Sequence, residues 1–370
     1  MTAQTRVRFA IVGFGGVIGA THIATLKRIP EAELVGLADV DAVRGAARAA
    51  EAGAPFFTDH TRMLKETNPD VLVVTTPHPF HPSLAMEALA GGRHVLCEKP
   101  MAIDVASADA MIAAADKAGR MLAINFQSRF RASVAKARAL IDEGAVGPLL
   151  RVLSIEPWFR PETYFHQSSW RGTWNGEGGG VLFNQAPHSL DLLCYLAGRP
   201  SKVWGWTRTR HHHIETEDTA QAMLEFANGA AGYLCFSTYE DGAERRLEIA
   251  GENGVIELVG AKVIVRRLNP SLPVFSDTTT ETFGKPTSTT EVFDFAANDD
   301  GLHYHIYVDL IAAIREGRQP RCNGKEGLMS LELANAIVLS SYQGGKPVTL
   351  PIERAAYSTL LHDLQAKAKK

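Results

Sequence analysis

The triplet Glu98-Lys99-Pro100 directly follows Val95-Leu96-Cys97, an apolar run that the sequence predicts to be a short buried strand. A proline placed after a strand ends it and keeps the preceding residue out of helical backbone space. Open α/β sheets bind ligands at the carboxyl ends of their strands, so we expect Lys99 at a ligand site. Its ammonium group could stabilise a developing alkoxide and lower the pKa of a substrate hydroxyl.

A second group of polar side chains lies in the stretch Gly178–Asp191, which opens with three consecutive glycines. These glycines would let the backbone approach a flat or bulky group closely. A helix beginning near Leu182 would place Asn184, His188 and Asp191 on one face. An imidazole with its ordinary pKa of about 6.5 accepts a proton at neutral pH. A histidine on a helix is often structural, but the neighbouring polar groups favour His188 as a general base and Asn184 as its companion.

The N-terminal region predicts a nucleotide-binding turn. A strand, Val7–Val12, leads into a glycine-rich turn and then into an amphipathic helix that ends near Arg28. There the backbone can approach a pyrophosphate, and the helix N-terminus supplies free N–H groups. The third glycine of the dinucleotide pattern is either replaced by Ile18 or displaced by one residue to Gly19. The expected cofactor contacts in the turn are Gly13, Phe14, Gly15, Gly16, Val17 and Ile18.

Asp39 extends this pattern, because it ends the second predicted strand, Glu33–Ala38. A carboxylate at this position accepts hydrogen bonds from the ribose hydroxyls of the adenosine and repels a 2′-phosphate. Asp39 therefore favours NAD, with NADP as the less favoured alternative. Arg44 in the next helix could weaken the preference for NAD over NADP. We favour the alternative interpretation, in which Arg44 is a solvated charge on the helix surface.

The next strand, Asp70–Thr75, delivers Thr76 and Pro77 to the same sheet edge, where we expect both to contact the cofactor. His81 opens the following helix and lies either near the cofactor or in a partly exposed loop. The alternation of strands and helices is typical of a parallel sheet. We therefore predict a doubly wound Rossmann domain over residues 1–126. Its remaining elements are predicted at Ser83–Ala90, Asp104–Ala118 and Met121–Phe126.

Residues 127–370 predict an α+β domain with a large, mainly antiparallel open sheet. Asn228-Gly229 is the best two-residue hairpin signal in the chain. Phe275–Thr290 is rich in Thr and Ser and predicts a surface loop. Bulky residues on both faces of the sheet suggest a homodimer or homotetramer formed through its uncovered face. Beyond a helix at 132–143, the predicted strands are Leu149–Glu156, Lys202–Thr209, Asp218–Phe226, Ala230–Thr238, Arg245–Ala250, Val255–Val259 and Lys262–Arg266, and the late helices are Leu302–Glu316 and Lys325–Tyr342.

Composition excludes several classes of protein. The chain has 370 residues, 45% of them hydrophobic and 21% charged, which is typical of a globular protein, and a net charge of −3 gives no basic field for nucleic acid or membranes. A polar N-terminus, no long apolar span and four scattered cysteines lead us to expect a cytoplasmic protein with reduced thiols. The run His211–His213 lacks the spacing of a structural metal site, so no metal is expected.

Substrate specificity is expected from the segment that precedes the glycine run, because aromatic rings stack on sugar C–H surfaces and Arg or His bonds hydroxyl groups. Packing between domains is the alternative role for each of these aromatic residues. Trp170 and Arg171 are also placed near the cofactor, and Gln127 is expected to contact both cofactor and substrate. The candidate substrate contacts are Lys99, Gln127, Trp158, Arg160, Tyr164, His166, Asn184, His188 and His303.

The chain resembles the Gfo/Idh/MocA oxidoreductases, named for glucose–fructose oxidoreductase and inositol dehydrogenase, in its glycine turn, Asp39, Pro77 with His81, Glu98-Lys99-Pro100 and the stretch Gly178–Asp191. The resemblance covers nearly the whole chain. It implies a Rossmann domain followed by a domain with an open sheet, and a sugar or cyclitol hydroxyl as substrate. It also implies that Lys99 and His188 are the catalytic pair and that Glu98 binds the nicotinamide riboside.

The chain departs from the family at one position. Many members carry an aspartate four residues before the histidine, whereas this chain has Asn184, which can bond a hydroxyl but carries no charge. The leading hypothesis is an NAD-dependent dehydrogenase acting on a sugar, cyclitol or glycoside. The alternatives are an enzyme that retains NAD and cleaves a glycoside through transient oxidation, and a cofactor-binding regulator without turnover.

Overall fold

The computed structural model describes residues 5–296 and 302–368, which divide into two compact units. Within these residues the first unit holds 5–127, 175–178 and 302–331, and the second holds the remainder. The first unit therefore includes a helix, α11 (Leu302–Glu316), that follows the whole of the second sheet in the sequence.

The first unit is built on a six-stranded parallel sheet with the order β3-β2-β1-β4-β5-β6, which confirms the predicted Rossmann topology. The chain leaves the sheet at β3 and returns on the other side of β1, so a ligand-binding switch point lies at the carboxyl ends of β1 and β4. The strands are β1 (Val7–Val12), β2 (Ala32–Ala38), β3 (Phe56–Phe57), β4 (Val71–Val74), β5 (His94–Cys97) and β6 (Leu122–Ile124); the helices are α1 (Val17–Leu26), α2 (Ala42–Ala52), α3 (His60–Thr67), α4 (His81–Ala90) and α5 (Val105–Ala118), with 3₁₀ turns η1 (His78–Phe80) and η2 (Gln127–Phe130), although η2 extends into the second unit.

The second unit is built on a nine-stranded sheet with the order β14-β13-β12-β11-β7-β10-β9-β8-β15. Only the β7–β10 pair is parallel among its described pairings, so the predicted mainly antiparallel sheet is confirmed. Its strands are β7 (Leu149–Pro157), β8 (Lys202–Arg208), β9 (Thr219–Glu225), β10 (Ala231–Ser237), β11 (Arg246–Gly251), β12 (Gly254–Val259), β13 (Lys262–Asn269), β14 (Thr287–Asp294) and β15 (Val348–Thr349); its helices are α6 (Ala132–Asp142), α7 (Glu162–His166), α8 (Val181–Asn184), α9 (Pro187–Ala197), α10 (Leu272–Thr278), the later part of α12 (Gly324–Tyr342) and α13 (Arg354–Ala368).

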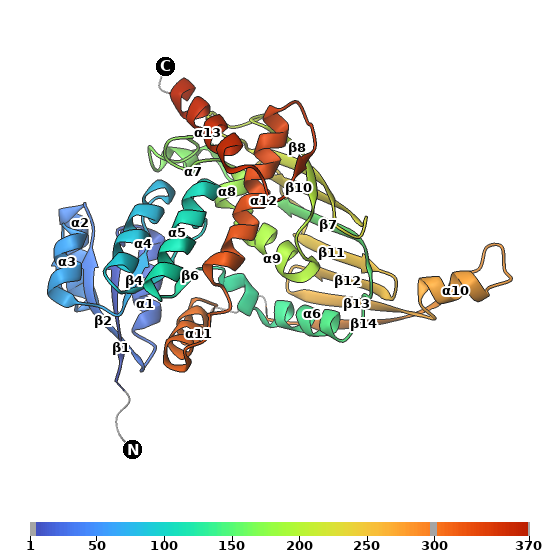
Figure 1. The fold of residues 1–370 in the computed structure, drawn as a ribbon, viewed down its shortest axis with the longest axis horizontal. Helices are drawn as coiled ribbons and strands as arrows, with labels where there is room; N and C mark the ends of the chain where they lie inside the picture. The colour runs from blue at the N-terminus through green and yellow to red at the C-terminus, as the bar shows by residue number, and fades with distance from the viewer. Residues whose placement is uncertain (1–4, 297–301, 369–370) are drawn as a thin grey trace. The chain divides into compact units, whose positions relative to one another are not determined.

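Helices α6 and α9 pack on one face of this sheet, against β12 and β13 and against β7 and β11, respectively (Figure 1). The other face leaves bulky side chains exposed, among them Trp206, Met223 and Tyr233. Such a face fits the expected oligomer interface, which stays a prediction. The hairpin predicted at Asn228-Gly229 joins β9 to β10, with Gly229 in the left-handed region at φ 83°.

The segment Phe275–Thr290, predicted to be a loop, is in part regular structure. Helix α10 ends within it at Thr278, and β14 begins at Thr287 and pairs antiparallel with β13. The prediction was wrong because a run of Thr is ambiguous: threonine is common in polar loops, but its branched Cβ also suits an exposed edge strand.

The single helix predicted from Leu182 is also corrected, since the chain forms α8 and α9 with a break at residues 185–186. Pro187 begins α9 and has no N–H group with which to continue a hydrogen-bond ladder from α8. The consecutive glycines were expected to let the backbone approach a ligand, but the close approach is to the protein itself. A Cβ on Gly180 would lie 1.8 Å from the carbonyl oxygen of Glu217.

Asp191, predicted to share a face with His188, follows it by three residues in α9 and makes a buried ion pair with Arg129. Its carboxylate accepts from Nε of Arg129 at 2.8 Å and from Nη2 at 2.6 Å. The pair joins η2 to α9. All four cysteines lie in the described chain and form no disulfide. No helix of the described residues is long and apolar enough to cross a membrane.

We predict that Arg129→Met lowers the free energy of unfolding by about 3–5 kcal/mol, because Asp191 would be left charged and buried without its partner. Urea denaturation followed by circular dichroism measures the change. Arg62→Met is the matched control, since the Arg62–Glu66 pair is exposed and its loss should have a much smaller effect. Equal effects of the two substitutions would contradict a structural role for the buried pair.

Candidate active site

The turn between β1 and α1 is shaped to receive a phosphate group. Gly16 caps α1 without a side-chain hydrogen bond, and a Cβ at this position would meet no atom within 4 Å. The N–H groups of the first helical turn are therefore offered to open space. A Cβ on Gly19, in contrast, would lie 2.3 Å from the Cα of Phe14. Gly19 therefore has the packing role of the third glycine in the dinucleotide-binding pattern. The pattern is one residue longer than usual, and Ile18 does not replace its third glycine.

Asp39 lies beside this turn at the end of β2. Its Oδ2 accepts a hydrogen bond from the N–H of Gly15 at 2.6 Å, and its Oδ1 accepts from the N–H of Asp41 at 2.9 Å. These bonds hold the half-buried carboxylate of Asp39 at the glycine turn. Each of its oxygens can accept a further hydrogen bond, for example from a ribose hydroxyl. Arg44 pairs with Asp41 at the surface, as expected of a solvated helix charge. The residues of this turn fit the adenosine and pyrophosphate of a dinucleotide.

The buried carboxylate of Glu98 is the centre of a polar network at the end of β5. Nε2 of His22 lies 2.9 Å from Oε1 of Glu98, and the side-chain amide of Asn125 donates to the same oxygen. Burial by itself would raise the pKa of Glu98, but the hydrogen bond and charge of His22, with the charge of Lys99, lower it below the usual carboxyl range. Glu98 is therefore a carboxylate held in one orientation next to Lys99.

Tyr307 completes the network from α11, with its hydroxyl 2.8 Å from Nδ1 of His22. Since a carboxylate only accepts, Nε2 of His22 donates to Glu98, while Nδ1 of the same ring is hydrogen-bonded to the Tyr307 hydroxyl. The sequence analysis missed His22, Asn125 and Tyr307. A signal for His22 was present, because it is a polar residue within the buried stripe of α1 that also contains Gly19, Ile23 and Leu26.

His303 stands edge-on to His22, with ring centroids 5.2 Å apart, and burial lowers its pKa. Among the described residues, His22, Glu98 and His303 form the only group of three metal-ligand side chains, with ligand atoms within 4.8 Å of one another. Both ring nitrogens of His22 already have protein partners. We therefore interpret the group as a hydrogen-bond network.

His81 is buried at the start of α4, and burial lowers its pKa. Its ring nitrogens lie 2.9 Å from the carbonyl oxygen of Pro100 and 2.7 Å from that of Thr76. The sequence left two roles open, and of these a partly exposed loop residue does not fit this geometry. A place near the cofactor stays a prediction. The contacts make His81 a brace between the ends of β4 and β5, and Pro77 starts the short 3₁₀ turn beside it.

In the second unit, the hydroxyl of Tyr164 joins several predicted site residues. It donates to Oδ1 of Asn184 at 3.2 Å and receives bonds from Arg171 at 2.5 Å and from the amide of Gln185 at 3.3 Å. The guanidinium of Arg171 also stacks on Tyr164 and on Trp170. Asn184 is thus held by the hydroxyl group of Tyr164.

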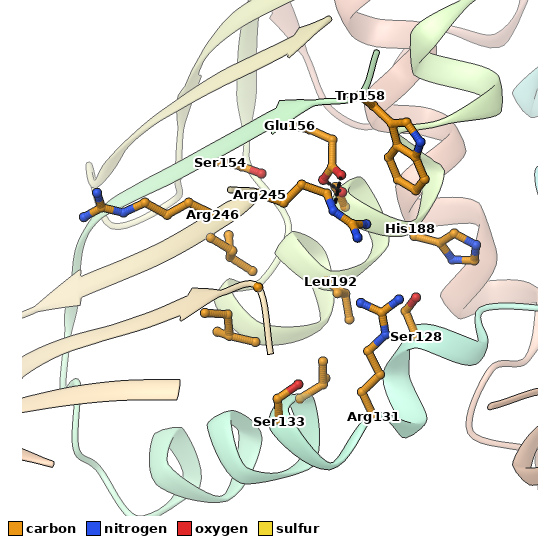
Figure 2. Close-up of a pocket in the computed structure, with 15 residues that line it drawn as sticks. Ser128, Arg131, Ser133, Ser154, Glu156, Trp158, His188, Leu192, Arg245 and Arg246 are labelled. Carbon is orange, nitrogen blue, oxygen red and sulfur yellow. Dashed lines mark hydrogen bonds and ion pairs between the residues drawn. The ribbon is translucent and has the colours of Figure 1, made fainter. Parts of the chain in front are cut away.

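His188 lies at a cavity of about 90 Å³ on the helix-covered face of the second sheet (Figure 2). The cavity is lined by polar and apolar side chains, which include Ser128, Arg131, Glu156, Trp158, Ser189 and Arg245. Only Trp158 and His188 among these were predicted as site residues. Arg131, Glu156 and Arg245 were missed because they come from three separate elements whose assembly has no local sequence signal.

The structure thus groups the predicted residues into sets. Lys99, Glu98 and His303 gather in the first unit, where Gln127 has a buried side-chain oxygen without a hydrogen bond in the described chain. Asn184 joins Tyr164, Trp170 and Arg171 in the second. Arg160 stacks on Trp158 and Tyr164, whereas His166 is exposed and pairs with Glu162. The run His211–His213 does not form a shared site: His211 stacks on Tyr239, His212 is buried, and His213 is exposed.

Comparison with known proteins agrees with this geometry. A family model described as oxidoreductase family, NAD-binding Rossmann fold, matches residues 7–126, and a GFO/IDH/MocA C-terminal domain model matches residues 134–257. The crystal structure of the WlbA dehydrogenase from Bordetella pertussis in complex with NADH and UDP-GlcNAcA is 32% identical, with a TM-score of 0.80, and the similarity covers 94% of this chain and 100% of that one.

Two full-length relatives have named activities. The 1,5-anhydro-D-fructose reductase of Ensifer adhaerens is 27% identical over 337 residues, 89% of this chain and 96% of its own length. The myo-inositol 2-dehydrogenase of Thermotoga maritima is 25% identical over 354 residues, 89% and 95% of the two chains. Together with the family models, these similarities confirm the predicted oxidoreductase class, the predicted NAD-binding domain and the resemblance to the family.

We predict that the protein prefers NAD to NADP and that Asp39→Ala narrows the preference, because the substitution removes the charge that would repel a 2′-phosphate. The ratio of the affinities for NADH and NADPH, measured by fluorescence titration, reports the change. Arg44→Ala is the control and should leave the ratio nearly unchanged. A wild-type protein that binds NADPH more tightly would overturn the assignment.

Proposed function

Because the chain belongs to the Gfo/Idh/MocA family of NAD-binding oxidoreductases, we propose that it transfers a hydride from a secondary hydroxyl carbon of a sugar, cyclitol or glycoside to NAD, with Lys99 and His188 as the acid–base pair. The observation that carries the proposal is the Glu98 network, which holds Lys99 at the carboxyl end of a Rossmann strand. The sugar and cyclitol substrates in the names of the two full-length relatives support the substrate class.

The proposed chemistry divides between the residues as follows. His188 accepts the hydroxyl proton of the substrate, and the Lys99 ammonium stabilises the negative charge that develops on its oxygen. The carbon then loses its hydrogen with the electron pair, and a ketone forms. Bound NAD supplies the acceptor for that hydride. Glu98 lies directly before Lys99 and places a fixed negative charge beside the lysine.

Asn184 has a positioning role in this proposal. Its side-chain oxygen accepts from Tyr164, so its amide N–H₂ group is directed by that bond and can bond a substrate hydroxyl or the imidazole of His188. Without a charge at residue 184, the imidazole has no carboxylate partner from this position.

We predict that Lys99→Ala lowers turnover by ~10²-fold or more while NAD binding stays largely intact, since one electrostatic or acid–base group would be lost. Sugars, inositols and glycosides are offered with NAD and followed by the absorbance of reduced nicotinamide, and product analysis separates a ketone from a released sugar. Lys325→Ala, which removes an exposed lysine from the same unit, is the control. Near-normal turnover by Lys99→Ala would make the lysine structural and remove the core of the proposal.

We predict that Asn184→Asp moves the acidic limb of the pH–rate profile for oxidation to higher pH. A carboxylate at this position would favour the imidazolium and so raise the pKa of His188 above its value beside asparagine. The base must then be deprotonated at a higher pH. The profile is measured at saturating NAD, with a deuterium isotope effect showing that hydride transfer limits the rate. An unmoved acidic limb would mean that residue 184 and His188 are not coupled or that His188 is not the base.

A further inference from the structure

Asn184 ends the short helix α8, directly before the break that separates α8 from the helix of His188. Its N–H group donates to the carbonyl oxygen of Gly180 at 3.0 Å, and Pro187 begins α9 without an N–H group that could continue this ladder. The backbone therefore places Asn184 but does not orient its side chain. A side-chain amide can be turned over with almost no change of shape, so its hydrogen-bond partners decide which way the oxygen and the N–H₂ group face.

The hydroxyl of Tyr164 contacts both residues at the start of this break. It donates to Oδ1 of Asn184 at 3.2 Å, and it accepts from Nε2 of Gln185 at 3.3 Å and from Nη1 of Arg171 at 2.5 Å. A hydroxyl has one proton to donate and two lone pairs that accept. Because Arg171 can only donate and Gln185 donates as well, the proton of Tyr164 is directed to residue 184. The oxygen of Asn184 is thereby turned toward α7.

Arg171 also fixes the ring that carries this hydroxyl. Its guanidinium lies over Tyr164, 4.3 Å from the ring centroid, and over Trp170 at 4.7 Å. Arg160 stacks on the same tyrosine at 5.2 Å, but its Nη1 donates to the carbonyl oxygen of Phe159. Two guanidinium groups thus hold the tyrosine ring, and the hydrogen bond from Arg171 also sets the direction of its hydroxyl.

The residue type at position 184 explains why such a partner matters. The two oxygens of an aspartate are equivalent, so turning the side chain over leaves the same acceptors in place. The oxygen and the N–H₂ group of Asn184 are not equivalent, and the wrong orientation would exchange a donor for an acceptor. A chain with asparagine at this position therefore needs a neighbour that selects one of the two orientations.

We propose that Tyr164 is a positioning residue for the oxidation: its hydroxyl, supported by Arg171 and Gln185, selects the orientation of Asn184 in which the N–H₂ group points away from α7. Residue 184 then acts as a hydrogen-bond donor, which suits an oxygen of the substrate hydroxyl or of the ketone that forms from it. This inference rests on the proposed function and deepens it, because it assigns a part in the reaction to residues outside the acid–base pair.

The first test observes the amide itself and needs no turnover. The protein is labelled with ¹⁵N-asparagine and saturated with NADH, and the side-chain amide signals of Asn184 are identified by their absence from the spectrum of Asn184→Asp. We expect Tyr164→Phe, which removes the hydroxyl and keeps the ring, to shift these signals. Tyr239→Phe is the matched control and should not shift them, because it removes the hydroxyl of another tyrosine of the same unit, one that stacks on His211. Unmoved signals in Tyr164→Phe, or an equal shift in Tyr239→Phe, would overturn the proposal.

Arg171→Met tests the support of the hydroxyl with the same signals. It should shift them as Tyr164→Phe does, and combining the two substitutions should add little, because both act through one hydroxyl group. Arg160→Met is the matched control, since it removes a guanidinium from the same ring without removing the bond to the hydroxyl. Equal shifts in the two arginine variants would mean that ring stacking positions the amide, which contradicts the role of the hydroxyl.

The second test measures turnover of D-glucose, myo-inositol and methyl β-D-glucoside with NAD, using variants shown to be folded by circular dichroism. Tyr164→Phe should lower kcat by ~10-fold, the usual effect of losing one hydrogen bond that positions a reacting group, and leave the KM for NAD within about twofold. In the Asn184→Asp background the same substitution should lower kcat by less than about threefold, since a carboxylate needs no selected orientation. Equal losses in the two backgrounds would rule out orientation of the amide as the role of Tyr164.

The positioning role and the proposed oxidation can fail separately. If Tyr164→Phe shifts the amide signals of Asn184 but the wild-type protein oxidises none of the three compounds, the orientation of the amide stands and the oxidation of such substrates fails. If the wild-type protein oxidises one of them and Tyr164→Phe does so equally well, the oxidation stands and the positioning role fails.

Discussion

The carboxylate of Glu98 is buried in the first unit, and a buried charge is tolerated only where fixed donors surround it. His22 and Asn125 supply these donors, and Tyr307 fixes the ring of His22 in turn. The three partners come from α1, from the end of β6 and from α11, so one carboxylate ties a nucleotide-binding helix, a sheet strand and a late helix together. The position of Lys99, the next residue, depends on this arrangement.

The same constraint explains why a helix from the far end of the sequence belongs to the first unit. The Tyr307 ring is fully buried and packs edge-on against Phe9 of β1, with centroids 5.3 Å apart. Apolar packing and the hydrogen bond to His22 therefore act in the same place. His81 braces the other side of the segment through the carbonyl of Pro100. The Glu98-Lys99-Pro100 triplet is thus held by side-chain contacts from several directions, which suits a group that must be positioned accurately.

In the second unit, the period of two along each strand separates the chemical roles of the two sheet faces. Glu156 of β7 and Trp158, which follows the strand, line the cavity on the side of the helices, while Arg151 of β7 faces the uncovered side with Glu248 of β11. The buried pair of Arg129 and Asp191 joins η2 to α9, the helix that carries His188. One residue of register shift in β7 or β11 would exchange these faces and remove the cavity.

The sequence by itself determined the parts of this protein that are encoded locally. The strand and glycine turn that precede α1, Asp39 at the end of β2 and the triplet after β5 are continuous patterns, and their backbone requirements can be inferred from neighbouring residues alone. Only the tertiary structure decided that Asp191 is an ion-pair partner, that α8 and α9 are separate, and that a Thr-rich segment pairs as an edge strand. The tertiary structure also decided the partners of Glu98 and the arginines beside Glu156. These contacts join residues tens to hundreds of positions apart. They depend on packing and strand register, which cannot be inferred from the spacing of neighbouring residues.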